Sequence, residues 1–449
     1  MRVISALLTT LPSLVWAASL PSPDVDSRSA PDVETIQQSA QTISLSQVEN
    51  KNYQREDPSV ELIRTFVKYG KPLTPGLSEA IELNADLNAK FKSYIGDGGG
   101  TGTVQASPPA LFDIQYVVPV LIGTPPQKTY LNLDTGSADF SLLTSASLSW
   151  TFSTDTYKPM VRNQTLYKPN NSSTSKLLKG EAWNIRYGDG AGASGIVYKD
   201  RVQVGGTFFN QQGVQSAVQV SFEISRDNFA SGIMGMAMKG INTVRPTPQH
   251  SYFENILDSL KEPVFTANLQ KGRPGNYNFG YIDAKEHVGN ITYAPLLTDT
   301  HFWEVNVTGY QVDGSPYQPV VWNALVDTGT SLLILPENIV NEYYTAVEGA
   351  AFDPRRGMML FPCEVQLPDF YFGIGEYRGK IPGHYINYGK ADPSYCYGGI
   401  QATDIQGPSV LGDILLKAQF VVFDGGKNAV GFANKQLLPP TKILNGIGE

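Results

Sequence analysis

The 449-residue sequence has few of the residues on which most metalloenzymes and serine hydrolases depend. It contains two cysteines and four histidines, and the histidines are widely scattered, at positions 250, 287, 301 and 384. A metal site needs several such ligands at close spacing, so we expect no metal. No other cofactor is expected either. The Gly-x-Ser-x-Gly sequence of an α/β-hydrolase nucleophile is also missing, which argues against a Ser/His/Asp hydrolase.

Charge and long apolar runs are also scarce. Charged residues make up 17% of the chain, the net charge is −8, and no basic patch suggests nucleic-acid binding. Beyond the first residues no apolar run could cross a bilayer, and residues 439–449 lack a lipid-anchor tail, so no membrane anchor is expected. Arg2, the mostly apolar stretch 3–16 and Ala17-Ala18 predict a signal peptide over residues 1–18, and hence a secreted, extracellular protein.

Glycine and proline, by contrast, are abundant, with 43 and 30 residues. Runs of four to eight apolar or β-branched residues recur between Gly, Pro, Asn and Asp, which is typical of short strands. The first strand pair is predicted over residues 113–123, and a helix over 336–347. Because the chain is too long for one core, we expect a mainly β protein with two lobes.

Two short sequences repeat one pattern 193 residues apart: Asp134-Thr-Gly136-Ser137 and Asp327-Thr-Gly329-Thr330. Each follows an apolar, strand-like approach. The glycine allows close backbone approach, and the hydroxyl residue behind it can donate a hydrogen bond to the carboxylate. Two carboxyl groups about 3 Å apart cannot both ionise easily, so they share one proton over a broad acidic range. Such a pair can activate a water molecule and protonate a carbonyl oxygen.

With these motifs the chain resembles the pepsin-like aspartic endopeptidases of the secreted fungal type, over roughly residues 112–433. This family is the standard example of a carboxylate dyad. The resemblance also rests on residues 183–190, 232–235, 263–266, 279–283, 411–413 and 422–424. It implies a mainly β, bilobal pepsin-like fold with the active-site cleft between two pseudo-symmetric lobes. The catalytic residues would be Asp134 and Asp327, and the residues that support them Gly136, Ser137, Gly329 and Thr330.

The resemblance further implies a zymogen that hydrolyses polypeptides at acidic pH, works as a monomer and is inhibited by its own propeptide. The predicted parts are a signal peptide (1–18), a propeptide (19–100, here called the leader), an N-terminal lobe with a flap (101–295) and a C-terminal lobe with a disulfide (296–449). Asp413, in a Leu-Gly-Asp sequence, would adjust the electrostatics of the aspartate pair.

Within the leader, residues 19–46 predict no regular structure, helices are predicted from Asp57 and over 78–91, and residues 96–102 form a glycine-rich linker. Lys68 and Tyr69 match the family's inhibitory element, in which an ammonium group lies between the two carboxylates and a tyrosine covers the cleft. Lys51 and Lys71 are alternatives for the lysine.

Residues 183–198 predict a β-hairpin with a glycine-rich tip. By resemblance it is the flap, with Tyr187, Gly188 and Asp189 binding substrate, a preference for apolar residues at P1 and P1′, and acceptance of Lys at P1 through Asp189. Residues 190–195 also fit Gly-x-Gly-x-x-Gly, but a strand and not a helix follows, which argues against a nucleotide site. One departure is Ser141, where the family usually has a tryptophan.

The two cysteines, Cys363 and Cys396, are an even count in a chain predicted to be secreted, which favours one disulfide. The resemblance places a disulfide there as well. Five Asn-x-Ser/Thr sequences are candidate glycosylation sites, at Asn163, Asn170, Asn171, Asn290 and Asn306. The competing function is a pepsin-fold binding or inhibitor protein with weak or no catalysis. Both Asp-Thr-Gly motifs argue for the enzyme, whereas Ser141 keeps the alternative open.

Overall fold

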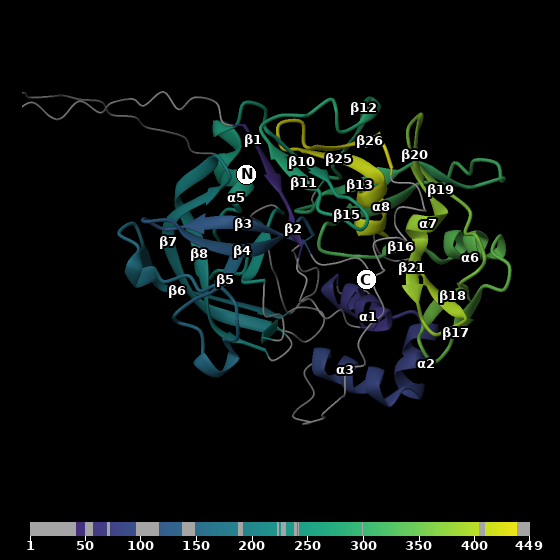
Figure 1. Ribbon diagram of the computed structural model, residues 1–449, viewed down its shortest axis with the longest axis horizontal. Coiled ribbons are helices and arrows are strands. Elements are labelled where there is room, and N and C mark those ends of the chain that lie inside the picture. The colour runs from purple at the N-terminus through teal and green to yellow at the C-terminus, as the bar shows by residue number, and fades with distance from the viewer. Residues whose placement is uncertain are drawn as a thin grey trace, which may run out of the picture. The chain divides into compact units, whose positions relative to one another are not determined.

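A computed structural model describes residues 42–49, 57–69, 72–95, 116–136, 149–186, 192–221, 224–225, 230–237, 240, 242–298, 300–403 and 409–437. The predicted signal peptide, Ser137, Ser141 and the flap residues Tyr187, Gly188 and Asp189 lie outside these ranges. The described chain is mainly β (Figure 1), as the sequence predicted. Its strands form five sheets.

The largest sheet has eight strands, in the order β2-β3-β4-β9-β5-β8-β7-β6. Where the sequence predicted a strand pair over residues 113–123, the described residues form a single strand, β3, whose antiparallel partner β4 lies beyond that range. The bounds are β2 Val48–Glu49, β3 Tyr116–Ile122, β4 Gln127–Asp134, β5 Ser149–Phe152, β6 Lys176–Arg186, β7 Gly192–Val204, β8 Thr207–Val220 and β9 Gly232–Gly235.

A five-stranded sheet in the second half of the chain repeats part of this topology. Its order is β13-β15-β24-β16-β23. The pairs β4–β9, β9–β5 and β5–β8 are parallel, antiparallel and parallel, and β15–β24, β24–β16 and β16–β23 follow the same sequence. Each Asp-Thr-Gly motif therefore lies at the end of an equivalent strand. The bounds are β13 Glu304–Val307, β15 Trp322–Val326, β16 Leu333–Pro336, β23 Ile400–Thr403 and β24 Ser409–Leu411.

A six-stranded sheet, ordered β1-β11-β10-β25-β26-β12, joins distant parts of the chain. Every residue of β25 is buried, and Phe423 stacks on Phe265 at 4.5 Å between ring centroids. The edge strand β1 belongs to the leader, in a stretch where the sequence predicted no regular structure. The bounds are β1 Ile43–Ser46, β10 Val264–Asn268, β11 Asn276–Phe279, β12 Val288–Pro295, β25 Gln419–Asp424 and β26 Ala429–Asn434.

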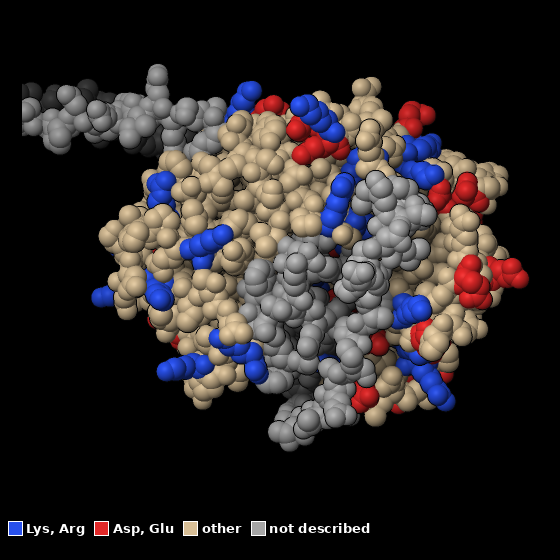
Figure 2. Space-filling view, in the orientation of Figure 1, with Lys and Arg blue, Asp and Glu red and all other residues tan. Residues whose placement is uncertain are grey.

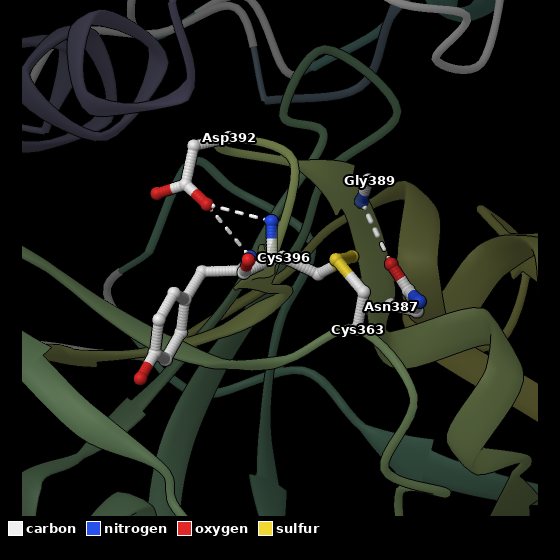
Figure 3. The surroundings of a disulfide bond; sticks show 7 residues. Cys363, Asn387, Gly389, Asp392 and Cys396 are labelled. Carbon is white, nitrogen blue, oxygen red and sulfur yellow. Dashed lines mark hydrogen bonds between the residues drawn. A yellow bond between two sulfur atoms is a disulfide. The ribbon is translucent and has the colours of Figure 1, made fainter.

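Two small sheets complete the β structure. The three-stranded sheet contains β14 Gly309–Val312, β19 Phe370–Ile374 and β20 Tyr377–Ile381. The four-stranded sheet contains β17 Ala351–Asp353, β18 Met358–Pro362, β21 Asn387–Lys390 and β22 Tyr395–Gly398. The predicted disulfide is confirmed here: Cys363, just after β18, bonds to Cys396 in β22 (Figure 3), with Cα atoms 5.0 Å apart.

The leader supplies three helices. The carboxylate of Asp57 caps α1 by accepting a hydrogen bond from Ser59 N at 2.8 Å, and Pro58 occupies the first turn, as the sequence predicted. The single helix predicted over 78–91 is instead two helices. Asn84 ends the first, and its side-chain oxygen accepts from Asp86 N at 3.0 Å to begin the second. The bounds are α1 Pro58–Lys68, α2 Pro75–Leu83 and α3 Ala85–Ile95.

The remaining helices are short and lie between strands. The predicted helix over 336–347 is confirmed as α6, whose inward face buries Ile339, Val340 and Tyr343. None of the described helices is long and apolar enough to span a membrane. The bounds are α5 Tyr252–Ile256, α6 Glu337–Thr345, α7 Gly383–Ile386 and α8 Asp413–Ala418, with 3-10 turns at Lys158–Met160, Pro169–Asn171 and Leu257–Ser259.

Candidate active site

Each Asp-Thr-Gly motif is held at the end of a buried strand by a neighbouring strand. Asp134 is the last residue of β4, and its carbonyl accepts from Met236 N, just beyond β9, at 2.9 Å. Asp327 directly follows β15, and its N–H donates to Leu411 O in β24 at 3.1 Å. Because the backbone on both sides is paired, each aspartate has a fixed position and direction.

The two motifs are joined directly by a reciprocal set of hydrogen bonds between Thr135 and Thr328, here called the threonine pair. Each threonine N–H donates to the other's Oγ1, at 3.0 and 2.9 Å. Each hydroxyl in turn donates to a carbonyl on the opposite strand, Thr135 to Val326 O at 2.9 Å and Thr328 to Leu133 O at 2.8 Å. The sequence interpretation gave neither threonine a role, although the same residue in both motifs was a visible signal.

The glycines bring the carboxylates together. Gly136 N donates to Oδ1 of Asp134 at 3.0 Å, and Gly329 N donates to Oδ1 of Asp327 at 2.7 Å. A Cβ atom on either glycine would lie 2.3 Å from the Cγ of the opposite aspartate. Only glycine therefore allows both carboxyl groups to occupy this space. Thr330 Oγ1 also donates to Oδ2 of Asp327, as the sequence predicted for a supporting hydroxyl.

Lysine and tyrosine side chains from the leader fill the position between the carboxylates. Lys68 Nζ lies 3.2 Å from Oδ1 of Asp134 and 2.9 Å from Oδ2 of Asp327. The hydroxyl of Tyr69 donates to the same Oδ2 of Asp327 at 2.5 Å, and it lies 3.4 Å from Gly136 O. Asp134 and Asp327 are 5% and 0% exposed, so these contacts are made away from bulk water.

The electrostatics of this group follow from burial and opposite charge. Burial alone would raise the pKa of Asp327, but the Lys68 ammonium and the hydrogen bonds from Thr330 and Tyr69 lower that pKa from 3.8 to about 2. Burial would lower the pKa of Lys68, yet the two carboxylates raise it above its ordinary 10.5. Asp134, Asp327 and Lys68 therefore stabilise one another in their charged forms.

Asp413 contacts the second motif through its backbone. Its N–H donates to Thr330 O at 2.7 Å, and its carboxylate lies 3.4 Å from Lys417 Nζ. Asp413, at the start of α8, thus supports the loop that carries Asp327. Its carboxylate forms an ion pair with Lys417 on the same helix.

The base of the predicted flap lies on β6 and β7, which pair from Trp183 opposite Gly195 to Arg186 opposite Gly192. The indole N–H of Trp183 lies 3.2 Å from both Ile196 O and Ser216 O, and its ring stacks on Trp150. The strand β7 follows the glycine-rich tip, which agrees with the rejection of a nucleotide site there.

In the parts of the chain that the structure describes, no three His, Cys, Asp or Glu side chains lie close enough together to hold a metal ion. Lys and Arg side chains are spread over the described surface in Figure 2 and are interspersed with acidic groups on its right-hand side. The chemistry that the two juxtaposed carboxyl groups offer is general acid and base action on a water molecule and a polar substrate bond.

Known proteins share this pattern across most of the chain. The model of the eukaryotic aspartyl protease family matches residues 115–435. Podosporapepsin from Podospora anserina is 40% identical over 412 residues, which cover 91% of this chain and 94% of the relative. Endothiapepsin from Cryphonectria parasitica is 41% identical over 395 residues, 87% of this chain and 90% of the relative. A solved aspartic proteinase from Irpex lacteus shares the fold, with a TM-score of 0.58, 20% identity and coverage of 74% of this chain and 96% of its own.

The threonine pair should be required for stability. In Thr328→Val the carbonyl of Leu133 loses its donor and the N–H of Thr135 loses its acceptor, both in a buried site. We expect the free energy of unfolding to fall by about 2–6 kcal/mol, from about 1–3 kcal/mol for each of the two groups left unsatisfied. Urea denaturation followed by fluorescence measures it. The control is Thr266→Val, because the buried Oγ1 of Thr266 has no hydrogen-bond partner among the described residues. Equal losses in the two variants would contradict the role of the pair.

Proposed function

Because this chain belongs to the eukaryotic aspartyl protease family and is an aspartic-type endopeptidase acting on polypeptides, we propose that Asp134 and Asp327 are its catalytic pair and that the leader is a removable inhibitor. The observation that carries both statements is the position of Lys68 Nζ, within 3.2 Å of both carboxylates. A lysine at this position would prevent the two carboxyl groups from acting on a water molecule, which supports an inhibitory leader. Because it contacts Asp134 and Asp327 together, its position also supports these two residues as the groups that are inhibited.

In the active enzyme the two carboxyl groups share one proton. The ionised carboxylate takes a proton from a water molecule as that water attacks the peptide carbonyl carbon, and the protonated carboxyl donates its proton to the carbonyl oxygen. The N–H groups of Gly136 and Gly329 and the hydroxyl of Thr330 keep the carboxyl groups in place, because each donates to one of them. Ser137, which lies outside the described residues, is the corresponding hydroxyl of the first motif. No cofactor takes part.

Removing one carboxylate tests the catalytic pair. Asp327→Asn keeps the shape of the side chain but cannot act as an acid or base, so kcat should fall by about 10²–10⁴-fold. The assay is cleavage of a denatured protein at acidic pH after removal of the leader. Asp258→Asn, an exposed aspartate on the turn Leu257–Ser259, is the control and should retain the parent's activity. If the parent itself cleaved nothing, the alternative of a pepsin-fold binding or inhibitor protein would be favoured instead.

The leader blocks the pair in two ways. The Lys68 ammonium keeps both carboxylates ionised, and the Tyr69 hydroxyl occupies a hydrogen-bonding position on Asp327 that a catalytic water would need. The pKa of Asp327 is depressed from 3.8 to about 2 in this arrangement. A depressed carboxyl pKa stabilises the blocked form at pH values above the ordinary carboxyl pKa, and this stabilisation is lost as the pH falls through about 2. Acidification therefore weakens the block.

Lys68→Ala should shift activation to a higher pH. In the parent chain we expect cleavage of the leader to begin only below about pH 4, because protonation of Asp327 must precede it. Without the ammonium group this onset should rise by about one to two pH units. Gel electrophoresis of samples incubated between pH 2 and 7 measures it. Lys51→Ala and Lys71→Ala, outside the described residues, are the controls. If the Lys68→Ala profile matched the parent's, the assignment to Lys68 would be wrong.

For specificity, we propose that Tyr187, Gly188 and Asp189 close over the substrate from the tip of the hairpin β6–β7. This tip favours apolar residues at P1 and P1′, and the Asp189 carboxylate pairs with a Lys at P1. Tyr187 lines the pocket as the family resemblance implies. The pairing of β6 with β7 up to Arg186 and Gly192 supports a hairpin at this position.

Asp189→Ser should lower kcat/KM selectively for peptides with Lys at P1. A lost charge pair of about 1–3 kcal/mol corresponds to a decrease of roughly 5–150-fold. Matched peptides with Phe at P1 should change less than twofold. Steady-state kinetics on the two peptide series decides the matter, and equal losses in both would remove the proposed role of Asp189.

We also propose that the chain is a secreted, monomeric glycoprotein with a signal peptide at 1–18, a leader at 19–100 and lobes at 101–295 and 296–449. The repeated topology around β4 and β15 supports two lobes. All five candidate glycosylation sites lie at exposed positions: Asn163, Asn170, Asn171, Asn290 and Asn306. Mass spectrometry of the protein secreted by its host tests the processing and the glycans together.

A further inference from the structure

Besides the aspartate contact and the strands β1 and β2, the helical part of the leader contacts the rest of the chain at a further place. This place, here called the hairpin platform, consists of residues 351–362, which form the hairpin β17–β18, together with Tyr397 of β22. Figure 1 shows α2 next to β17. The hairpin and the leader helix are separated by more than 260 residues in sequence, so tertiary structure alone brings them together.

The apolar part of the contact is tight. The backbone of Gly76 lies on the ring of Phe352, because a Cβ atom on Gly76 would be 2.4 Å from the ring Cζ. On the other side, a Cβ atom on Gly357 would be 2.7 Å from Leu77 Cδ1 and 2.9 Å from Ala80 Cβ. Leu77 and Ala80 are both 0% exposed. Glycines on both partners thus allow helix α2 and the hairpin to approach closely.

Polar contacts hold the start of α1 and the end of α2. The Tyr397 hydroxyl donates to Oδ2 of Asp57 at 3.2 Å, while Oδ1 of the same carboxylate caps α1. At the junction of α2 and α3, Asn84 Nδ2 donates to Arg355 O at 3.3 Å. The platform therefore recognises a helix N-terminus, a helix face and a helix C-terminus of the same segment, residues 57–95.

We propose that the hairpin platform is a docking site for residues 57–95 that works independently of the Lys68 contact and keeps this segment bound after acid has opened the aspartate pair. The proposal rests on the inhibitory role proposed for the leader and adds a second attachment to it. The released segment would remain on the enzyme as a non-covalent partner until it is itself cleaved or dissociates.

The two attachments should respond differently to pH. The Lys68 contact depends on two ionised carboxylates, whereas the contacts of Gly76, Leu77 and Ala80 with the hairpin contain no titratable group. The titratable and charged groups near the platform are Asp57 of α1, Arg355, Arg356 and Asp353 of the hairpin, and Asp392 and Tyr397 beside it; Glu79 and Glu82 of α2 and Asp86 of α3 are exposed.

Of these groups, Asp57 accepts a hydrogen bond from Tyr397 across the contact, and a protonated carboxyl can still bond to a tyrosine hydroxyl. The helix α1 has 11 residues and so separates Asp57 from Lys68 by about 16 Å, twice the Debye length of about 8 Å at physiological salt. The charge change at the aspartates therefore has little direct effect on the platform.

The test excises residues 57–95 from the folded full chain. A recognition sequence for one specific protease is inserted within residues 50–56 and a second copy within 97–107, in an Asp134→Asn background that prevents self-digestion. After cutting, gel filtration and mass spectrometry measure the fraction of the segment that stays with the enzyme. We expect retention at pH 7 in the parent, and at both pH 7 and pH 3 in Lys68→Ala, where the contact with the aspartates is missing at either pH.

Platform variants should release the segment at both pH values. Ala80→Arg places a long cation in a fully buried contact and should lower retention at least tenfold, whereas Ala89→Arg, the same change at an exposed position of α3, should not. Phe352→Ala changes the hairpin and not the leader, so a loss of retention in this variant cannot arise from a misfolded leader. The Phe352 side chain is 39% exposed, and the core does not need it. Val321→Ala, at a residue that is 63% exposed, is its control.

Two results would overturn the proposal: release of the segment by Lys68→Ala as complete as by Ala80→Arg, or full retention in Phe352→Ala. Either would mean that the hairpin platform does not hold residues 57–95 independently of the Lys68 contact. The inhibitory role of the leader has a separate readout, which is the protease activity of the chain with both aspartates intact. That role is contradicted only if this activity is the same before and after the leader is removed. The two failures are therefore distinguishable.

Discussion

The structure depends on holding two like charges close together in a buried place. Left to themselves, two carboxylates at this separation repel each other and lose their hydration. The threonine pair opposes this by connecting the two motifs through four hydrogen bonds that involve only backbone and hydroxyl groups. Because these bonds are made by the residues next to the aspartates, the carboxyl groups cannot move apart without leaving buried polar groups unsatisfied.

The same constraint explains how the leader works. A pair of ionised carboxylates in a buried site is a strong binding site for a cation, and Lys68 supplies one from the end of α1. The interaction is tight at neutral pH because both partners are charged, and it weakens in acid because protonation of Asp327 removes the attraction. In the function that we propose, inhibition and catalysis thus use the same two groups, and the pH decides which one is possible.

Several features could be predicted from residues alone. The two Asp-Thr-Gly motifs, the cap and first turn of α1 and the helix α6 are local patterns with local causes. The disulfide followed from a count of two cysteines together with the family resemblance. The break between α2 and α3 was missed, although the Asn84 side chain that causes it was present in the sequence, because the apolar pattern continues across it. Strand β1 was missed because its polar residues predict no strand until the edge of β11 is available for pairing.

The sequence by itself determined which groups are proposed to react: two aspartates, each beside a glycine and a hydroxyl residue. The family resemblance added Lys68 and Tyr69 as the groups proposed to block them, with Lys51 and Lys71 left as alternatives for the lysine. Only the tertiary structure decided how these groups meet. Three contacts join residues more than 190 positions apart. Each motif glycine packs against the opposite carboxylate, Thr135 and Thr328 hydrogen-bond to each other, and α2 packs on the hairpin β17–β18. Local propensity carries no information about such contacts, because they arise from the packing of complementary surfaces and not from the order of residues in the chain.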